Sequence, residues 1–193
     1  TAVISFMTAM RMGVARGVYT NEAGLGSSPI VAAAAKTNSC VKQGLISMTS
    51  VFFTTIVVCT MTGLVVISSG LLDNSELSGS ILVTEAYNAG LPINIGTYLI
   101  SFGLIFFAFT TILGWDYYSE RCLEYLTNGH KKKIIVYRWL YIIAVFIGPY
   151  MTVSAVWTIA DIFNGLMAIP NMIAMFALNG VVVFETKKFF KSR

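Results

Sequence analysis

The sequence predicts an all-α integral membrane chain. Hydrophobic residues make up 56% of its 193 residues and charged residues only 11%, and the mean hydropathy is +0.74. Soluble domains carry about 25% charged residues, so this composition fits a lipid environment. A membrane helix needs about 20 apolar residues, and the length therefore permits about five spans. We expect one multi-pass transmembrane region, residues 1–193, that is part of a longer protein in a plasma membrane of the bacterial inner-membrane type.

The first third of the chain predicts the end of one span, an elbow and a complete span. Residues 1–16 are apolar apart from Arg11 and Arg16, and we expect them to end a span. Residues 17–42 are rich in glycine and polar side chains, and Pro29 is expected near the start of a short helix. Residues 43–70 contain no charged side chain and give the clearest span.

Charge distribution indicates which connections lie on which side of the membrane. Residues 71–95 contain acidic side chains but no lysine or arginine, which predicts an extracellular loop with room for short helices. Residues 96–126 form the next expected span. The loop at 127–133 contains three lysines, so the positive-inside rule assigns it to the cytoplasm, and it assigns the elbow at 17–42 to the same side through Lys36 and Lys42.

The last third of the chain predicts one further span and one interrupted span. Residues 134–150 form the span, and residues 153–186 are too long for one straight crossing and short for two. The basic C-terminal end is expected in the cytoplasm, which requires an odd number of crossings after Tyr150. We therefore favour one helix with an unwound or tilted middle near Pro170 over two short spans.

Two groups of polar residues inside apolar stretches are candidates for function. Thr111 and Trp115 are four residues apart on one helical face, and Thr110 lies about 100° around the helix. Hydroxyl oxygens and the Phe107 carbonyl suit a hard cation such as sodium. The alternative is that the threonines donate to carbonyls three or four residues earlier.

The second group is Asp161 with Asn164, three residues apart on one face. These residues suit either a proton or cation relay or contact with a neighbouring helix. Asp116 and Asp161 would be the acids of an intramembrane aspartyl protease, but Asp161 follows Ile159 and Ala160 instead of the glycines expected there. The sequence contains no nucleophile with a base, no metal cluster and no phosphate loop, and we expect neither an enzyme nor a nucleic-acid partner.

Several segments resemble the alanine or glycine:cation symporter family, the amino acid carrier proteins. The longest is GVARGVYTNEAGLGSSP at residues 13–29. The similarity continues at residues 42–44, at Cys59-Thr60, at residues 109–118, at Tyr137-Arg138, and from Trp157 through Asp161 and Asn164 to Met167, Pro170 and Asn171. The resemblance therefore covers essentially the whole chain.

This resemblance implies the second five-helix half of an inverted-repeat fold of the leucine-transporter type, with the N-terminal half of the protein missing here. It also implies that Phe107, Thr110 and Thr111 help to bind sodium and that Thr111 and Trp115 border a bound alanine or glycine. The expected partners are a small amino acid, the co-transported sodium ion and membrane lipid, with no other cofactor. The expected function is cation-coupled symport by alternating access. The alternative is a channel or scaffold subunit that needs a partner chain.

Two positions depart from the family pattern. The family commonly has Phe-Ile-Asp-Thr where this chain has Phe52-Phe53-Thr54-Thr55, so a carboxylate is lost. Asp116 stands where a serine commonly follows the tryptophan. The first departure leaves the choice between sodium and proton coupling open.

Overall fold

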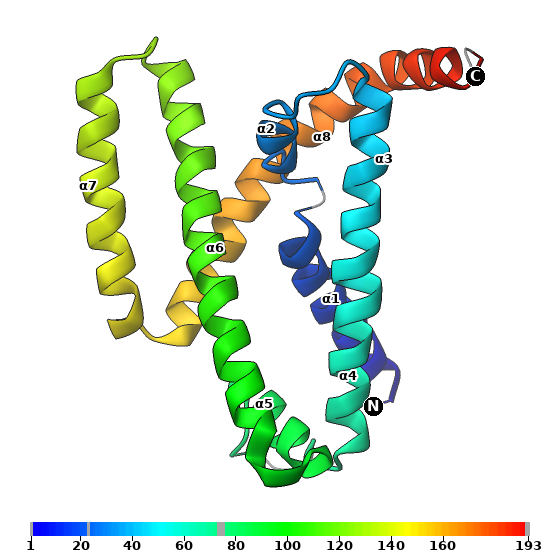
Figure 1. Cartoon of the computed structure of the whole chain (residues 1–193), viewed down its shortest axis with the longest axis vertical. Coiled ribbons are helices and arrows are strands. Elements are labelled where there is room, and N and C mark those ends of the chain that lie inside the picture. Colours follow the sequence, from blue (N-terminus) through cyan, green and yellow to red (C-terminus); the bar gives the residue numbers. More distant parts are fainter. Residues whose placement is uncertain (1, 23, 73–75, 192–193) are drawn as a thin grey trace. The chain divides into compact units, whose positions relative to one another are not determined.

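The computed structural model describes residues 2–22, 24–72 and 76–191. Every regular element among these residues is a helix, as Figure 1 shows. The described part of the chain therefore confirms the all-α prediction. The chain divides into two compact units, residues 1–51 with 118–193 and residues 52–117, and each unit is described by itself.

Among the described residues, four helices are long and apolar enough to cross a membrane. They are Cys40–Ser68, Pro92–Leu126, Lys131–Tyr150 and Val153–Lys191. Most of their large apolar side chains are exposed, as expected for surfaces that face lipid or other helices instead of water. The described helices thus confirm an integral membrane chain with several spans.

The first unit begins with α1 (Ala2–Asn21), α2 (Ser28–Ala32) and α3 (Cys40–Val51). Helix α1 extends beyond the span end expected at residue 16, because no strong helix breaker occurs before Glu22, where φ is +52°. Helix α2 carries its proline in the first helical positions, as expected for Pro29. Proline is tolerated there because an N–H at this point has no helical partner.

The second unit contains a π-helical segment in the first long span. Segment η1 (Phe52–Val58) joins α3 to α4 (Cys59–Ser68), so the helix is continuous from Cys40 to Ser68. A π-helical turn changes the rotation of the residues that follow it and is frequent at functional sites. It occupies the stretch in which threonines replace the family's carboxylate.

The loop expected at residues 71–95 is partly helical. It contains α5 (Gly79–Gly90), which contacts α4, and η2 (Pro92–Asn94) before the start of α6 (Ile95–Leu126). Asn88 fixes the turn, because its Nδ2 donates to Thr97 Oγ1 at 2.9 Å and its Oδ1 accepts from the Thr97 N–H at 3.0 Å. The Thr97 N–H lies in the first turn of α6, where helical partners are lacking.

The basic loop after α6 is a tight turn. Asn128 and Gly129 both have positive φ angles, +52° and +76°, and the chain then enters α7 (Lys131–Ile147) and η3 (Gly148–Tyr150). Glu120 joins the end of α6 to α7, since its Oε1 accepts from Arg138 Nε at 2.7 Å and lies 2.6 Å from Arg138 Nη2. Glu120 is 8% exposed.

Helix α8 (Val153–Lys191) is continuous and contains Pro170. The sequence predicted one helix with an unwound or tilted middle for residues 153–186, and α8 has no unwound segment there. Proline removes one helical hydrogen bond and favours a bend, but the remaining bonds on either side maintain the helix. In Figure 1 the red C-terminal part of α8 runs in a different direction from its yellow and orange part. Helix α8 contacts α3.

Candidate functional site

The predicted hydroxyl pair lies in the middle of α6. Thr110 follows Ile95 by about 15 residues and precedes Leu126 by about 16, which places it about 22 Å from either end of the helix. The side chains of Thr110 and Thr111 are exposed in this chain, and Trp115 is half-buried. The regular helix keeps Thr111 and Trp115 on one face, as the spacing predicted.

Thr110 donates to carbonyls three and four residues earlier, as the alternative interpretation of the threonines predicted. Its Oγ1 donates toward the carbonyls of Phe106 at 2.9 Å and Phe107 at 3.1 Å. A hydroxyl that donates its proton retains two lone pairs, and the hydrogen bond fixes their direction. This geometry is therefore compatible with both a packing role and cation coordination by Thr110.

A further threonine hydroxyl lies in the π-helical segment of the same unit. Thr55 Oγ1 is buried and has no hydrogen-bond partner among the described residues. A buried hydroxyl without a partner is costly, and most such groups are satisfied in complete proteins. Thr55 was not among the predicted site residues, and its buried hydroxyl adds a polar position to this unit.

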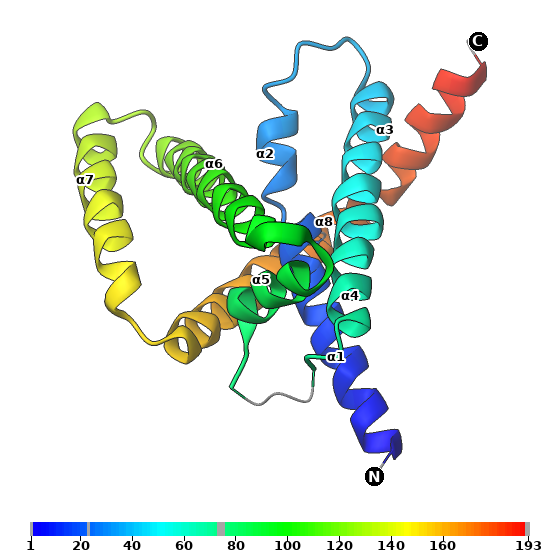
Figure 2. The same ribbon diagram turned by 60° about the horizontal axis from the view of Figure 1, so that its bottom comes forward.

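Asp161 belongs to a cluster that joins α8 to α1, here called the Arg16 cluster: Arg16, Tyr19, Trp157 and Asp161. Arg16 Nη1 lies 3.3 Å from Asp161 Oδ1, and the Tyr19 hydroxyl donates to the same oxygen at 2.5 Å. The Arg16 guanidinium lies 3.9 Å from the centroid of the Trp157 ring. Figure 2 shows α8 passing beside the C-terminal part of α1.

The aromatic rings complete the Arg16 cluster. Tyr19 and Trp157 meet edge to face at 89°, with their ring centroids 5.2 Å apart. Asn164, the second residue of the predicted relay, interacts with the Tyr19 side chain. Tyr19, Arg16 and Trp157 were not predicted as site residues. The sequence did contain a signal for this contact: Arg16 and Asp161 are opposite charges inside two apolar helices, and such charges usually pair.

The glycine-rich motif folds into a tight, buried turn, here called the glycine turn (Gly24 to Ser27). Both glycines have positive φ angles, +79° and +82°, which glycine adopts without a steric penalty. Leu25 is 4% exposed and Ser27 only 1%. Ser27 Oγ donates to Glu22 Oε2 at 2.6 Å. The positive φ angles and the two nearly buried side chains make this a tight turn within the segment expected to form an elbow.

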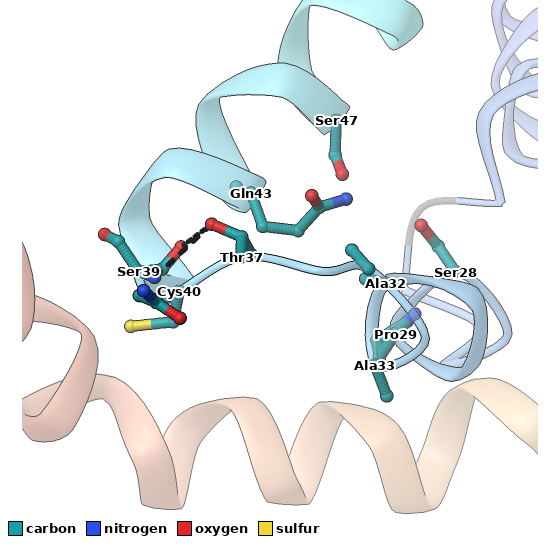
Figure 3. Close-up of a pocket in the computed structure, with 12 residues that line it drawn as sticks. Ser28, Pro29, Ala32, Ala33, Thr37, Ser39, Cys40, Gln43 and Ser47 are labelled. Carbon is teal, nitrogen blue, oxygen red and sulfur yellow. Dashed lines mark hydrogen bonds between the residues drawn. The ribbon is translucent and has the colours of Figure 1, made fainter.

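A hollow separates α2 from the start of α3 (Figure 3), with a volume of about 600 Å³. The Gln43 side chain extends from α3 toward α2, and Thr37 and Ser39 close one side through a shared hydrogen bond. The hydroxyl and amide groups that line this hollow suit water or a neutral polar group. No pattern in the sequence indicated this hollow.

The helices and their intramembrane polar groups define a class of protein. A chain with four helices able to span a membrane, hydroxyls at the middle of one and an ion pair on another, is a part of a multi-pass membrane protein. Polar and charged groups at such positions are typical of proteins that move ions or solutes.

The chain belongs to the Sodium:alanine symporter family, whose model matches residues 1–193. It is 50% identical over 188 residues to an uncharacterised transporter of Haemophilus influenzae, and the match covers 97% of this chain and 41% of that protein. It is 48% identical over 189 residues to the sodium/alanine symporter AgcS of Methanococcus maripaludis, covering 96% of this chain and 41% of AgcS. These findings confirm the family that the motifs indicated.

A third relative is the probable sodium/glutamine symporter GlnT of Bacillus subtilis, 38% identical over 188 residues, with 96% of this chain and 38% of GlnT covered. The chain thus spans about two fifths of the length of these relatives. No solved structure matches it. The named relatives are transporters, in agreement with the expectation of transport instead of catalysis.

Proposed function

We propose that the complete protein is a sodium-coupled symporter of a small amino acid, and that this chain is the second half of its inverted-repeat fold. The observation that carries the proposal is the family match over the whole chain. Alternating access would then move alanine or glycine into the cell with the sodium gradient. The site would lie near the bilayer midplane, where transporters of this architecture bind substrate and ion.

The sodium site would use the central turn of α6. The hydroxyl of Thr110 donates toward the Phe106 and Phe107 carbonyls, so its lone pairs point away from the helix axis. Thr110 and Thr111 together offer two hard oxygens, with the Phe107 carbonyl as a third. Sodium needs further oxygens, which would come from the N-terminal half of the protein.

Trp115 would limit the size of the substrate. It lies one turn after Thr111 on the same face of α6, so an amino acid bound at Thr111 would meet the indole ring. A large rigid ring leaves room for a methyl group and excludes longer side chains. AgcS is named for alanine and GlnT for glutamine, and the higher identity to AgcS favours a small substrate here.

The experiment uses the complete protein in proteoliposomes with an inward sodium gradient. Uptake of radiolabelled alanine is expected with sodium outside and is expected to disappear when choline replaces sodium. A proton gradient without sodium is the third arm and is expected to support no uptake. Equal accumulation in sodium and choline would remove sodium coupling.

Hydroxyl variants test the site itself. Thr110→Val is expected to raise the sodium concentration for half-maximal uptake by about five- to 150-fold, the equivalent of losing about 1–3 kcal/mol of ligand interaction. Thr110→Ser retains the hydroxyl and is expected to restore most of the sodium affinity. Thr62→Val is the matched control, because Thr62 Oγ1 also donates to a carbonyl four residues earlier, that of Val58 at 3.0 Å. An equal effect of both valine substitutions would indicate a packing role for Thr110.

A further inference from the structure

The Arg16 cluster attaches α1 to α8 by a contact that is only partly enclosed. The Arg16 and Asp161 side chains are 37% and 50% exposed, and one guanidinium nitrogen approaches one carboxylate oxygen at 3.3 Å. Asp161 lies about 12 Å along α8 from Val153. Its position within a candidate span makes an unpaired charge costly, so a conformation in which Arg16 has moved away requires another partner for the carboxylate.

The same unit contains a second ion pair with different properties. Glu120 is 8% exposed and lies within 2.7 Å of two nitrogens of Arg138. A two-nitrogen contact of this kind is stronger and more directional than a single one. The Glu120 pair therefore has the geometry of a permanent contact, whereas the charges of the Arg16 pair meet through one longer contact.

The glycine turn that follows α1 makes a second contact with α8, about 15 Å further along α8 and ten residues after Asp161. There the Asn171 side chain lies against Gly26, so closely that a Cβ on Gly26 would be 3.0 Å from Asn171 Oδ1. The residues beside Gly26 are almost fully buried, Leu25 at 4% and Ser27 at 1%. The glycine turn that follows α1 is thus close-packed against α8, whereas the contact of α1 itself with Asp161 is partly exposed.

We propose that Arg16 and Asp161 are positioning residues of the transport cycle: α1 pivots at the glycine turn, and Arg16 separates from Asp161 in one of the two access states. The proposal rests on the proposed symport, because alternating access requires helices to change their mutual positions. The two states of such an element differ by a small free energy, which a single exposed ion pair can bias in either direction. Asp161 then acts as a conformational contact instead of a relay for protons or cations.

Cross-linking the complete protein tests whether the contact must open. Arg16→Cys with Asp161→Cys is introduced after Cys40, Cys59 and Cys122 are replaced by serine, and a short cleavable thiol cross-linker joins the pair. Sodium-driven alanine uptake is expected to fall at least tenfold on cross-linking and to return to its earlier rate on cleavage. Glu120→Cys with Arg138→Cys is the control, and its cross-link is expected to leave uptake unchanged. Uptake that persists with Arg16→Cys and Asp161→Cys joined would overturn the proposal.

A distance measurement tests the proposal without relying on uptake by the substituted pair. Spin labels are placed on Val14 of α1 and Ile162 of α8, which are 65% and 58% exposed, with Ser28 and Met172 as the reference pair beside the glycine turn. Sodium with alanine is expected to shift the distance distribution of the first pair and leave the reference pair unchanged. If sodium and alanine leave the distance between the first pair unchanged, the proposed pivot is refuted. Absence of sodium-dependent uptake by the unmodified protein would instead refute the symport proposal.

Discussion

Replacing Gly26 by alanine is expected to destabilise the complete protein more than the same replacement at Gly24. The two glycines have nearly the same left-handed conformation, with φ angles of +82° and +79°. An L residue in this conformation costs about 1–2 kcal/mol relative to glycine. This backbone cost is common to both variants, so any difference between them reports on the surroundings.

The surroundings differ in one neighbour. A Cβ at Gly26 would lie 3.0 Å from Asn171 Oδ1, 3.2 Å from its Cγ and 3.3 Å from its Cβ, whereas a Cβ at Gly24 would meet nothing within 4 Å. Rotation of the amide cannot relieve the contact with Asn171 Cβ, and overpacking costs about 1–3 kcal/mol. Gly26→Ala should therefore lower the free energy of unfolding by about 2–5 kcal/mol and Gly24→Ala by about 1–2 kcal/mol.

Equilibrium unfolding of the purified complete protein in mixed detergent micelles measures these differences. Adding Asn171→Ala to Gly26→Ala removes the amide and leaves the backbone cost. Gly26→Ala should therefore lower the free energy of unfolding by less in the Asn171→Ala background than in the unmodified protein. Equal losses for Gly24→Ala and Gly26→Ala, or no such coupling with Asn171, would refute the packing of the glycine turn against α8.

Three further predictions concern other parts of the chain. Arg138→Gln should reduce the free energy of unfolding by about 1–3 kcal/mol, because it leaves the buried Glu120 carboxylate without its cation. Glu120→Gln should reduce it by less, because Arg138 is 55% exposed. Thermal denaturation of both variants gives the order of their stabilities, and the reverse order would contradict the burial argument. Asn88→Ala removes both hydrogen bonds to Thr97 and should increase amide hydrogen exchange at the start of α6 at least tenfold, whereas Asn88→Asp retains the acceptor for the Thr97 N–H and should have a smaller effect. Trp115→Ala should admit larger amino acids, measured as competition of serine, valine and glutamine against alanine uptake, and an unchanged order of competition would remove Trp115 from the site.

Apolar patterning predicted the spans because each has a simple physical requirement. A helix of about 20 residues satisfies its own backbone hydrogen bonds in lipid, so uncharged stretches such as residues 43–70 are recognisable without tertiary information. The start of α2 near Pro29 followed from a local backbone restriction in the same way. Proline gave a weaker signal inside α8, because one missing hydrogen bond can bend a helix or interrupt it, and neighbouring contacts decide which occurs.

The candidate site was predictable in part. Spacing alone placed Thr111 and Trp115 on one face of a helix, and α6 is regular through that turn. Helical periodicity could not predict the contact of Asp161 with α1, because Arg16 and Asp161 are 145 residues apart in the sequence. The roles of Phe107, Thr110 and Thr111 in sodium binding stay predictions, since they depend on oxygens from the other half of the protein.

The sequence by itself determined the lipid environment, the helical spans, the family and the helix face shared by Thr111 and Trp115, because each of these follows from local composition, periodicity or motif. Tertiary structure decided which segments come into contact. The contacts are the half-exposed pair of Arg16 with Asp161, the pair of the buried Glu120 with Arg138, and the packing of Gly26 against Asn171. Pairings of this kind depend on how distant segments pack, and a pattern along one helix carries no information about the helix that will lie beside it.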